Sequence, residues 1–165
     1  MGVIQRQGLK NTITTYLGIA IGFVSLIVIQ PQFLTKEELG LTRILYSFSI
    51  LVAMFVPLGI GNATTKYFPL FKDSDKNHHG YFAFMMLFPV LGFVLTTIVL
   101  LLSKDFIMAQ YVKESPLLTD FFYYIFPLTF ILAIISCLNV YCYANYKSTI
   151  PAFLNDVVAR LLVIA

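Results

Sequence analysis

Two long uncharged apolar runs, separated by a short polar link, most constrain what this chain can fold into. No charged residue occurs from residue 11 to residue 35, a run of 25 positions, or from residue 44 to residue 65, a run of 22. At about 1.5 Å rise per residue, either run as a helix covers the ~30 Å hydrocarbon core of a bilayer. The link is too short to form a domain. We therefore expect two antiparallel neighbouring helices in a membrane.

The overall composition agrees with this expectation. The chain has 165 residues, of which 59% are hydrophobic and 12% charged, whereas soluble domains average about 25% charged residues. The net charge of +3 is too small to suggest nucleic-acid binding. Two cysteines, Cys137 and Cys142, are too few for a zinc site, and no motif indicates a cofactor or a catalytic set. We expect a membrane protein that is not an enzyme.

The same apolar pattern recurs along the chain and predicts an all-α, polytopic transmembrane bundle. Residues 1–165 are expected to form a single transmembrane domain. Pro57 lies inside the second apolar run and is expected to kink or loosen that helix. Because the last apolar segment stops at Ala165, we expect the sequence to be an N-terminal fragment. The expected helices cover about residues 11–33, 42–64, 80–103, 119–146 and 150–165.

The first expected helix carries a stripe of small and polar residues. They recur at intervals of four and three positions, which places them on one helix face. The stripe either forms a seam against another helix, as its Gly-x-x-x-Gly spacing permits, or lines a watery cavity. A second stripe on residues 119–146 includes Asn139. The first stripe consists of Asn11, Thr15, Gly18, Gly22 and Ser25.

Asp156 and Arg160 are the ionisable residues that lie clearly inside an apolar segment. Charges within a membrane are costly, usually face a bundle interior or a wet cavity, and are functional candidates for that reason. With the acid four positions before the base, the two can also pair on one helix face. The sequence leaves open a functional site and a self-satisfied ion pair.

The distribution of positive charge predicts the orientation. With the N-terminus inside, the inner segments hold six Lys and Arg residues and the outer segments four. Positive charge favours the cytoplasmic side. We expect a multi-pass protein with a cytoplasmic N-terminus.

Three stretches of the opening hairpin resemble the start of bacterial polysaccharide flippases, within the multidrug/oligosaccharidyl-lipid/polysaccharide exporter superfamily. They are GLKNT at residues 8–12, QPQFLTKEELG at residues 30–40 and LGIGNATTKYF at residues 58–68. The resemblance covers about residues 8–70. Gln32, Lys36 and Leu39 differ from the family's usual Arg, Pro and aromatic residue.

The resemblance implies a two-lobed inner-membrane transporter of about twelve to fourteen helices, of which this chain would be most of the first lobe. Such proteins flip a polyprenyl-diphosphate-linked oligosaccharide, so the implied partners are that lipid, membrane lipids and the remaining helices. Lys66 matches the family's basic position, where it either meets the diphosphate or anchors the helix end. Arg160 is the second candidate cation. Candidate groups for the sugar are Asn11, Thr15 and Asn139.

Two other functions remain open. A drug or metabolite antiporter of the same superfamily would need an ion-coupling acid, and Asp156 is the intramembrane acid that the sequence offers. A small structural membrane subunit is the alternative from another class, and it requires Ala165 to be the natural terminus.

Overall fold

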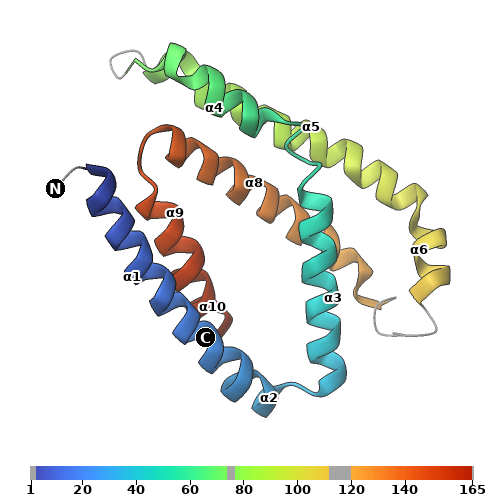
Figure 1. Ribbon diagram of the computed structural model, residues 1–165. Coiled ribbons are helices and arrows are strands. Elements are labelled where there is room, and N and C mark those ends of the chain that lie inside the picture. Colours follow the sequence, from blue (N-terminus) through green and yellow to red (C-terminus); the bar gives the residue numbers. More distant parts are fainter. Residues whose placement is uncertain (1–2, 74–76, 112–119, 165) are drawn as a thin grey trace. The chain divides into compact units, whose positions relative to one another are not determined.

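The computed structural model describes residues 3–73, 77–111 and 120–164, and in these ranges it contains helices and turns but no strand (Figure 1). Three helical stretches are long and apolar enough to cross a membrane, namely Gln5–Phe33, His78–Leu102 and Phe122–Ala144. The chain is therefore an all-helical membrane protein. Five spanning helices were expected, and this number is not confirmed.

The chain divides into two compact units. Unit 1 contains the chain up to Leu39 and the chain from Asn145 onward, and unit 2 contains Gly40–Ala144. The expectation of a single transmembrane domain stays a prediction.

Unit 1 is built from two long helical stretches that run side by side. The first is α1, which continues through a π-helical turn, η1, into the short helix α2. The second begins at α9 and continues through another π-helical turn, η4, into α10 (Figure 1). Their bounds are α1 Val3–Val24, η1 Ser25–Ile29, α2 Gln30–Phe33, α9 Thr149–Phe153, η4 Leu154–Val158 and α10 Ala159–Ile164.

The next helix, α3 (Lys36–Ala53), begins at a capping box. The Thr35 hydroxyl accepts the Glu38 backbone N–H at 3.3 Å, and the Glu38 carboxylate accepts the Thr35 backbone N–H at 2.8 Å. These bonds satisfy backbone donors that a helix start leaves unpaired. The backbone N–H bond holds the pKa of the Glu38 carboxyl below its usual range.

The second expected helix, 42–64, is broken in the structure. Helix α3 ends at Ala53, and α4 (Ile60–Phe71) begins after a turn in which Leu58 and Gly59 have φ of 49° and 79°. Pro57 explains the break, because it lacks an N–H and its ring clashes with the carbonyl four residues earlier, at Ala53. The expected kink is therefore a complete interruption.

The remaining helices agree more closely with expectation. Helix α5 follows the expected 80–103, and α8 with the preceding 3-10 turn η3 follows the expected 119–146, of which residue 119 lies outside the described residues. The last expected helix, 150–165, corresponds to α9, η4 and α10. The additional bounds are η2 Asn77–Gly80, α5 Tyr81–Leu102, α6 Lys104–Tyr111, η3 Phe122–Tyr124 and α8 Ile125–Ala144.

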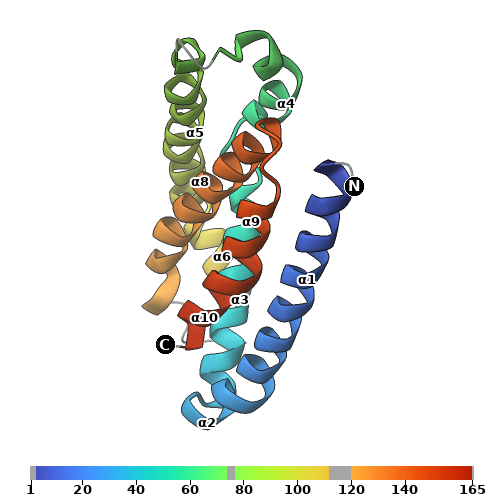
Figure 2. The same ribbon diagram turned by 90° about the vertical axis from the view of Figure 1, so that its left-hand side faces the viewer.

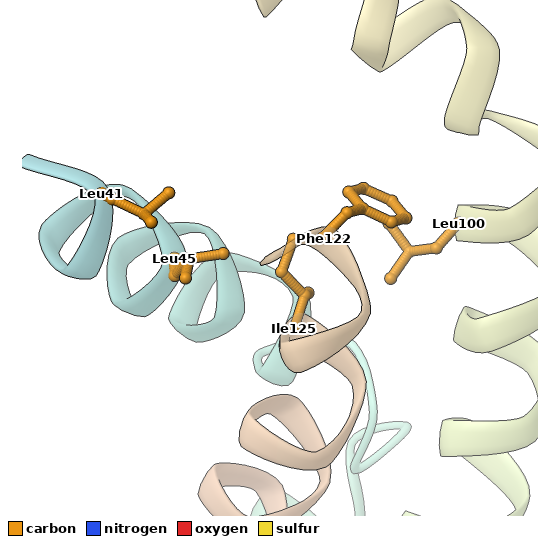
Figure 3. Packing of buried hydrophobic residues seen from close by; sticks show 5 residues of the cluster. All are labelled: Leu41, Leu45, Leu100, Phe122 and Ile125. Atoms are coloured by element: carbon orange, nitrogen blue, oxygen red, sulfur yellow. The ribbon is translucent and has the colours of Figure 1, made fainter. Parts of the chain in front are cut away.

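Unit 2 packs mainly through apolar contacts, and a buried hydrogen bond from the Tyr81 hydroxyl of α5 to the Thr64 hydroxyl of α4, at 3.2 Å, also joins two of its helices. Helix α8 contacts both α4 and α5, and α5 is the long green helix in Figure 2. Figure 3 shows one cluster, in which α3, α5, η3 and α8 contribute Leu41, Leu45, Leu100, Phe122 and Ile125. A second cluster joins α4, α5 and α8 through Ile60, Phe68, Tyr81, Met85 and Cys137.

A close backbone contact holds the interruption between α3 and α4 against α5. A Cβ atom placed on Gly92 would overlap the Val56 carbonyl oxygen and lie 2.8 Å from its carbon. Val56 also packs with Ala53 and Ala133 in a third buried cluster. Gly92 therefore lets the interrupted backbone approach α5 directly.

Candidate functional site

The first stripe lies on α1 and the first residue of η1, and we call it the α1 stripe. It packs against the second helical stretch of unit 1. Near the start of both, the Asn11 amide donates to the Ser148 hydroxyl at 3.2 Å, and Ser148 donates to the Gln7 side-chain oxygen at 3.3 Å. The Gln7 amide donates to the Tyr146 carbonyl at 2.7 Å. Residues later in α1 contact residues later in the second stretch. The helices α1 and α9–α10 therefore run parallel and begin at the same end of unit 1.

Further along, the stripe contacts both charged residues of the second helical stretch, Asp156 and Arg160. The Thr15 hydroxyl donates to the Asp156 carboxylate at 2.9 Å. The Arg160 guanidinium donates to the Gly18 backbone carbonyl. Both charged side chains are half-buried. In lipid, such polar bonds between helices replace the water that is missing there.

The glycines of the stripe make this approach possible. A Cβ atom on Gly18 would lie 2.5 Å from the Asp156 carbonyl oxygen and 2.8 Å from its Cβ. A Cβ on Gly22 would overlap the Arg160 guanidinium. Ser25, at the end of the stripe, is buried. The stripe is therefore a helix–helix seam, and its Gly-x-x-x-Gly spacing serves close contact, which is the first of the two interpretations left open above.

Asp156 and Arg160 do not form an ion pair with each other within the described part of the chain. Each is held by α1 instead, the acid by a hydroxyl and the base by a backbone carbonyl. The self-satisfied ion pair, one of the two alternatives that the sequence left open, is thus not formed. The physical reason is that α1 offers both a donor and an acceptor within reach, so neither charge depends on the other.

Both helical stretches of unit 1 contain a π-helical turn, and Asp156 lies in one of them. In η4 the Ala159 N–H bonds to the Leu154 carbonyl, five residues back. Such turns often occur at functional sites, because they re-aim side chains and carbonyls. Here the turn carries the carboxylate that Thr15 contacts and the backbone that packs on Gly18.

Four of the six predicted site residues, Asn11, Thr15, Asp156 and Arg160, are therefore brought together in unit 1. Lys66 and Asn139 belong to unit 2. Lys66 is exposed on α4, with its ammonium 5.2 Å from the centre of the Tyr67 ring. Asn139 is half-buried on α8.

Sequence reasoning missed Gln7 and Ser148, which complete the polar contacts at the start of the seam. Both precede the apolar segments that they join, so neither stands out within an apolar run. They are 141 positions apart, and nothing in the local pattern indicates that they meet.

The second stripe, which consists of Thr129, Ala133, Ser136 and Asn139 on α8, is buried only in part. Thr129 and Ala133 are buried on α8, whereas Ser136 is exposed. The Thr129 hydroxyl has no hydrogen-bond partner among the described residues. Among all residues that the structure describes, no group of three His, Cys, Asp or Glu side chains is placed to hold a metal ion.

Comparison with known proteins found no matching family model, no matching curated protein and no matching solved structure. The resemblance to polysaccharide flippases therefore rests on the three stretches quoted from the opening hairpin.

Proposed function

We propose that this chain belongs to a membrane transporter that flips a polyprenyl-diphosphate-linked oligosaccharide across the bacterial inner membrane, with its N-terminus in the cytoplasm. The observation that carries the proposal is the pair of charges in unit 1. Asp156 and Arg160 lie in an apolar helical stretch and are positioned by α1 rather than neutralised by each other. In an ordinary structural ion pair, the acid and the base would bond to each other.

Arg160 is the residue that we assign to the diphosphate. A guanidinium has five N–H donors in a planar fork that matches phosphate oxygens, and one of them is used on the Gly18 carbonyl. That bond orients the fork and leaves other donors for an anion. Charge-assisted, bidentate bonds of this kind are among the stronger polar contacts in proteins.

The other predicted residues take supporting roles. Asp156, Asn11 and Thr15 would hydrogen-bond sugar hydroxyls when the seam opens, because each bears a polar group that now bonds across it. Lys66 and Asn139 are proposed as a second cation and a further sugar contact. The remaining helices implied by the resemblance would complete the cavity.

The contacts in unit 1 also support a fourth membrane crossing. Gln7 bonds to Tyr146 and Asn11 to Ser148, so the start of α1 and the start of α9 lie at the same membrane face. In the proposed topology, an even number of crossings therefore separates them. Three candidate spans lie between these positions, counting α1 itself. The broken segment α3–α4 is the remaining apolar stretch, and discontinuous membrane helices of this kind are typical of transporters.

An antiporter is the second candidate function. The observation that favours it is the bond from Thr15 to the half-buried Asp156 carboxylate, since a coupling acid within the membrane needs a polar partner in its ionised form. This function predicts that Asp156→Asn abolishes transport of a small cationic substrate.

The test uses the complete gene in a strain that lacks its own flippase, with lipid-linked repeat units at the outer leaflet as the readout. We expect the wild type to restore export, Arg160→Gln to abolish it, and Arg160→Lys to retain part of it. Arg6→Gln is the matched control, because Arg6 is exposed near the start of α1. Failure of the wild type with every donor pathway tested, at normal protein level, would reject the proposal.

A further inference from the structure

An open apolar groove with one cation at its end runs along α3 in unit 2. The groove has a volume of about 340 Å³, and its lining includes Arg43, Ser47, Phe48 and Leu51 of α3 together with Ile107 and Phe122. A second groove of about 360 Å³ continues from Leu51 and is lined by apolar residues and Thr96. From these features we infer that the groove binds an anionic phospholipid, with the phosphate on Arg43 and an acyl chain along α3.

The position of Arg43 in the sequence supports a headgroup contact. It is the last charged residue before the uncharged run 44–65. A cation at the end of an apolar helix lies where lipid phosphates lie. Ser47 is one helical turn further along and lines the same groove, so its hydroxyl and the guanidinium face one side of α3.

The length of the groove supports an acyl chain. From Arg43 to Leu51 is eight residues, or about 12 Å of helix at 1.5 Å per residue. The second groove then continues to Phe55. Half of the ~30 Å hydrocarbon core is ~15 Å, so the two grooves extend from the headgroup level through one leaflet.

The positive charge of Arg43 favours an anionic lipid over a zwitterionic one. Arg43 is exposed and has no acidic partner in the part of the chain that the structure describes. Its neighbours one turn away on α3, Leu39 and Ser47, carry no charge. An unpaired guanidinium attracts a phosphate, and an anionic headgroup such as phosphatidylglycerol has no ammonium of its own to compete for that phosphate. The inference requires α3 to enter the membrane, but it does not depend on the transported substrate.

The test exploits the absence of tryptophan from the sequence. Phe48→Trp places a single fluorophore in the groove, where brominated lipids quench it on contact. The protein is reconstituted in phosphatidylcholine vesicles that contain a small, equal mole fraction of either brominated phosphatidylglycerol or brominated phosphatidylcholine. Phe23→Trp, at an exposed position of α1, reports ordinary lipid contact.

We expect the brominated anionic lipid to occupy the groove about fivefold more strongly than the zwitterionic one, as expected for ~1 kcal/mol from one basic residue. Arg43→Gln should reduce the ratio to one, and Arg43→Lys should preserve most of it. Lys36→Gln removes an equal charge from the same link but outside the groove, and it should leave the ratio unchanged.

Three results would overturn the inference. The first is equal quenching of Trp at position 48 by the two lipids. The second is selectivity that survives Arg43→Gln. The third is the absence of quenching at position 48 while position 23 is quenched, because the groove is then covered by protein, either a second copy or further helices.

Discussion

Units 1 and 2 achieve close helix packing by different means. In unit 1, glycines of α1 admit the polar backbone and charged side chains of residues 149–164, and hydrogen bonds cross the seam. In unit 2, Gly92 admits the interrupted backbone at Val56, and the surrounding contacts are apolar. Hydrophobic attraction between helices is weak in lipid, so both units rely on small residues. Small residues therefore permit close contact in both units, and hydrogen bonds cross the contact in unit 1, where polar groups lie beside the glycines.

The largest effect is expected in unit 2, at Gly92. Gly92→Ala would force the Val56 backbone away from α5, and backbone adjusts less easily than a side chain. We expect a loss of about 3 kcal/mol in the free energy of unfolding, at the upper end of overpacking costs. Denaturant titration in mixed micelles measures this. Gly40→Ala, where a Cβ meets nothing within 4 Å, is the control and should be neutral or slightly stabilising.

A smaller effect is expected at the corresponding glycine of unit 1. Gly18→Ala places its Cβ 2.5 Å from the Asp156 carbonyl oxygen, and the two helices must separate slightly. We expect a loss of about 2 kcal/mol in the same titration. Gly8→Ala, in open space on the same helix, should be neutral or slightly stabilising, because alanine has the higher helix propensity. An equal loss of stability at Gly8 and Gly18 would contradict the seam, because propensity cannot account for a loss at Gly8.

Thr15→Val tests the polar part of the seam with little change in volume. It removes the donor to Asp156, and we expect a loss of about 1 kcal/mol, as for other hydrogen bonds between membrane helices. The Thr12 hydroxyl bonds only the Gly8 carbonyl of its own helix, so Thr12→Val is the control. In a double-mutant cycle with Asp156→Asn, the two changes should not add. Additive losses would contradict a direct contact.

The smallest effect concerns the cap of α3. The bond from Thr35 lowers the pKa of the Glu38 carboxyl, so the folded state binds fewer protons there than the unfolded state does. The stabilisation is present above the ordinary pKa of the carboxyl and is lost as pH falls through the lowered value. We expect the difference in melting temperature between wild type and Glu38→Gln to disappear in acid. A difference that is constant with pH would reject the cap.

The parts of this structure that depend on local pattern were predictable from sequence. The apolar runs gave α1, α5 and α8, and the spacing of Asn11, Thr15 and Gly18 placed them on one face. The start of α3 at Lys36 was missed, although Thr35 and Glu38 form a recognisable capping-box pattern. The interruption after Ala53 was underestimated, because a hydropathy pattern does not register how far Pro57 and Gly59 turn the backbone.

Which residues meet at the seam could not be predicted from local sequence patterns. Thr15 and Asp156 are 141 positions apart, and many pairings of apolar helices satisfy the same hydropathy. The spacing of Asp156 and Arg160 permitted an ion pair within one helix and left a functional site open as the alternative. The structure instead gives each of them a partner on α1, and a sequence pattern cannot rank a distant partner against a near one.

Cross-linking at the start of the seam tests most directly whether the α1 stripe packs on residues 149–164 of the same chain. Asn11 and Ser148 are in contact, with their side-chain N and O atoms 3.2 Å apart. With Cys137 and Cys142 replaced by alanine, Asn11→Cys with Ser148→Cys should be bridged rapidly within one chain by a short thiol-specific reagent. Ile13→Cys with Ser148→Cys should react slowly, because Ile13 faces about 200° around the helix. Equal rates for the two pairs, or bridging only between separate chains, would contradict the seam.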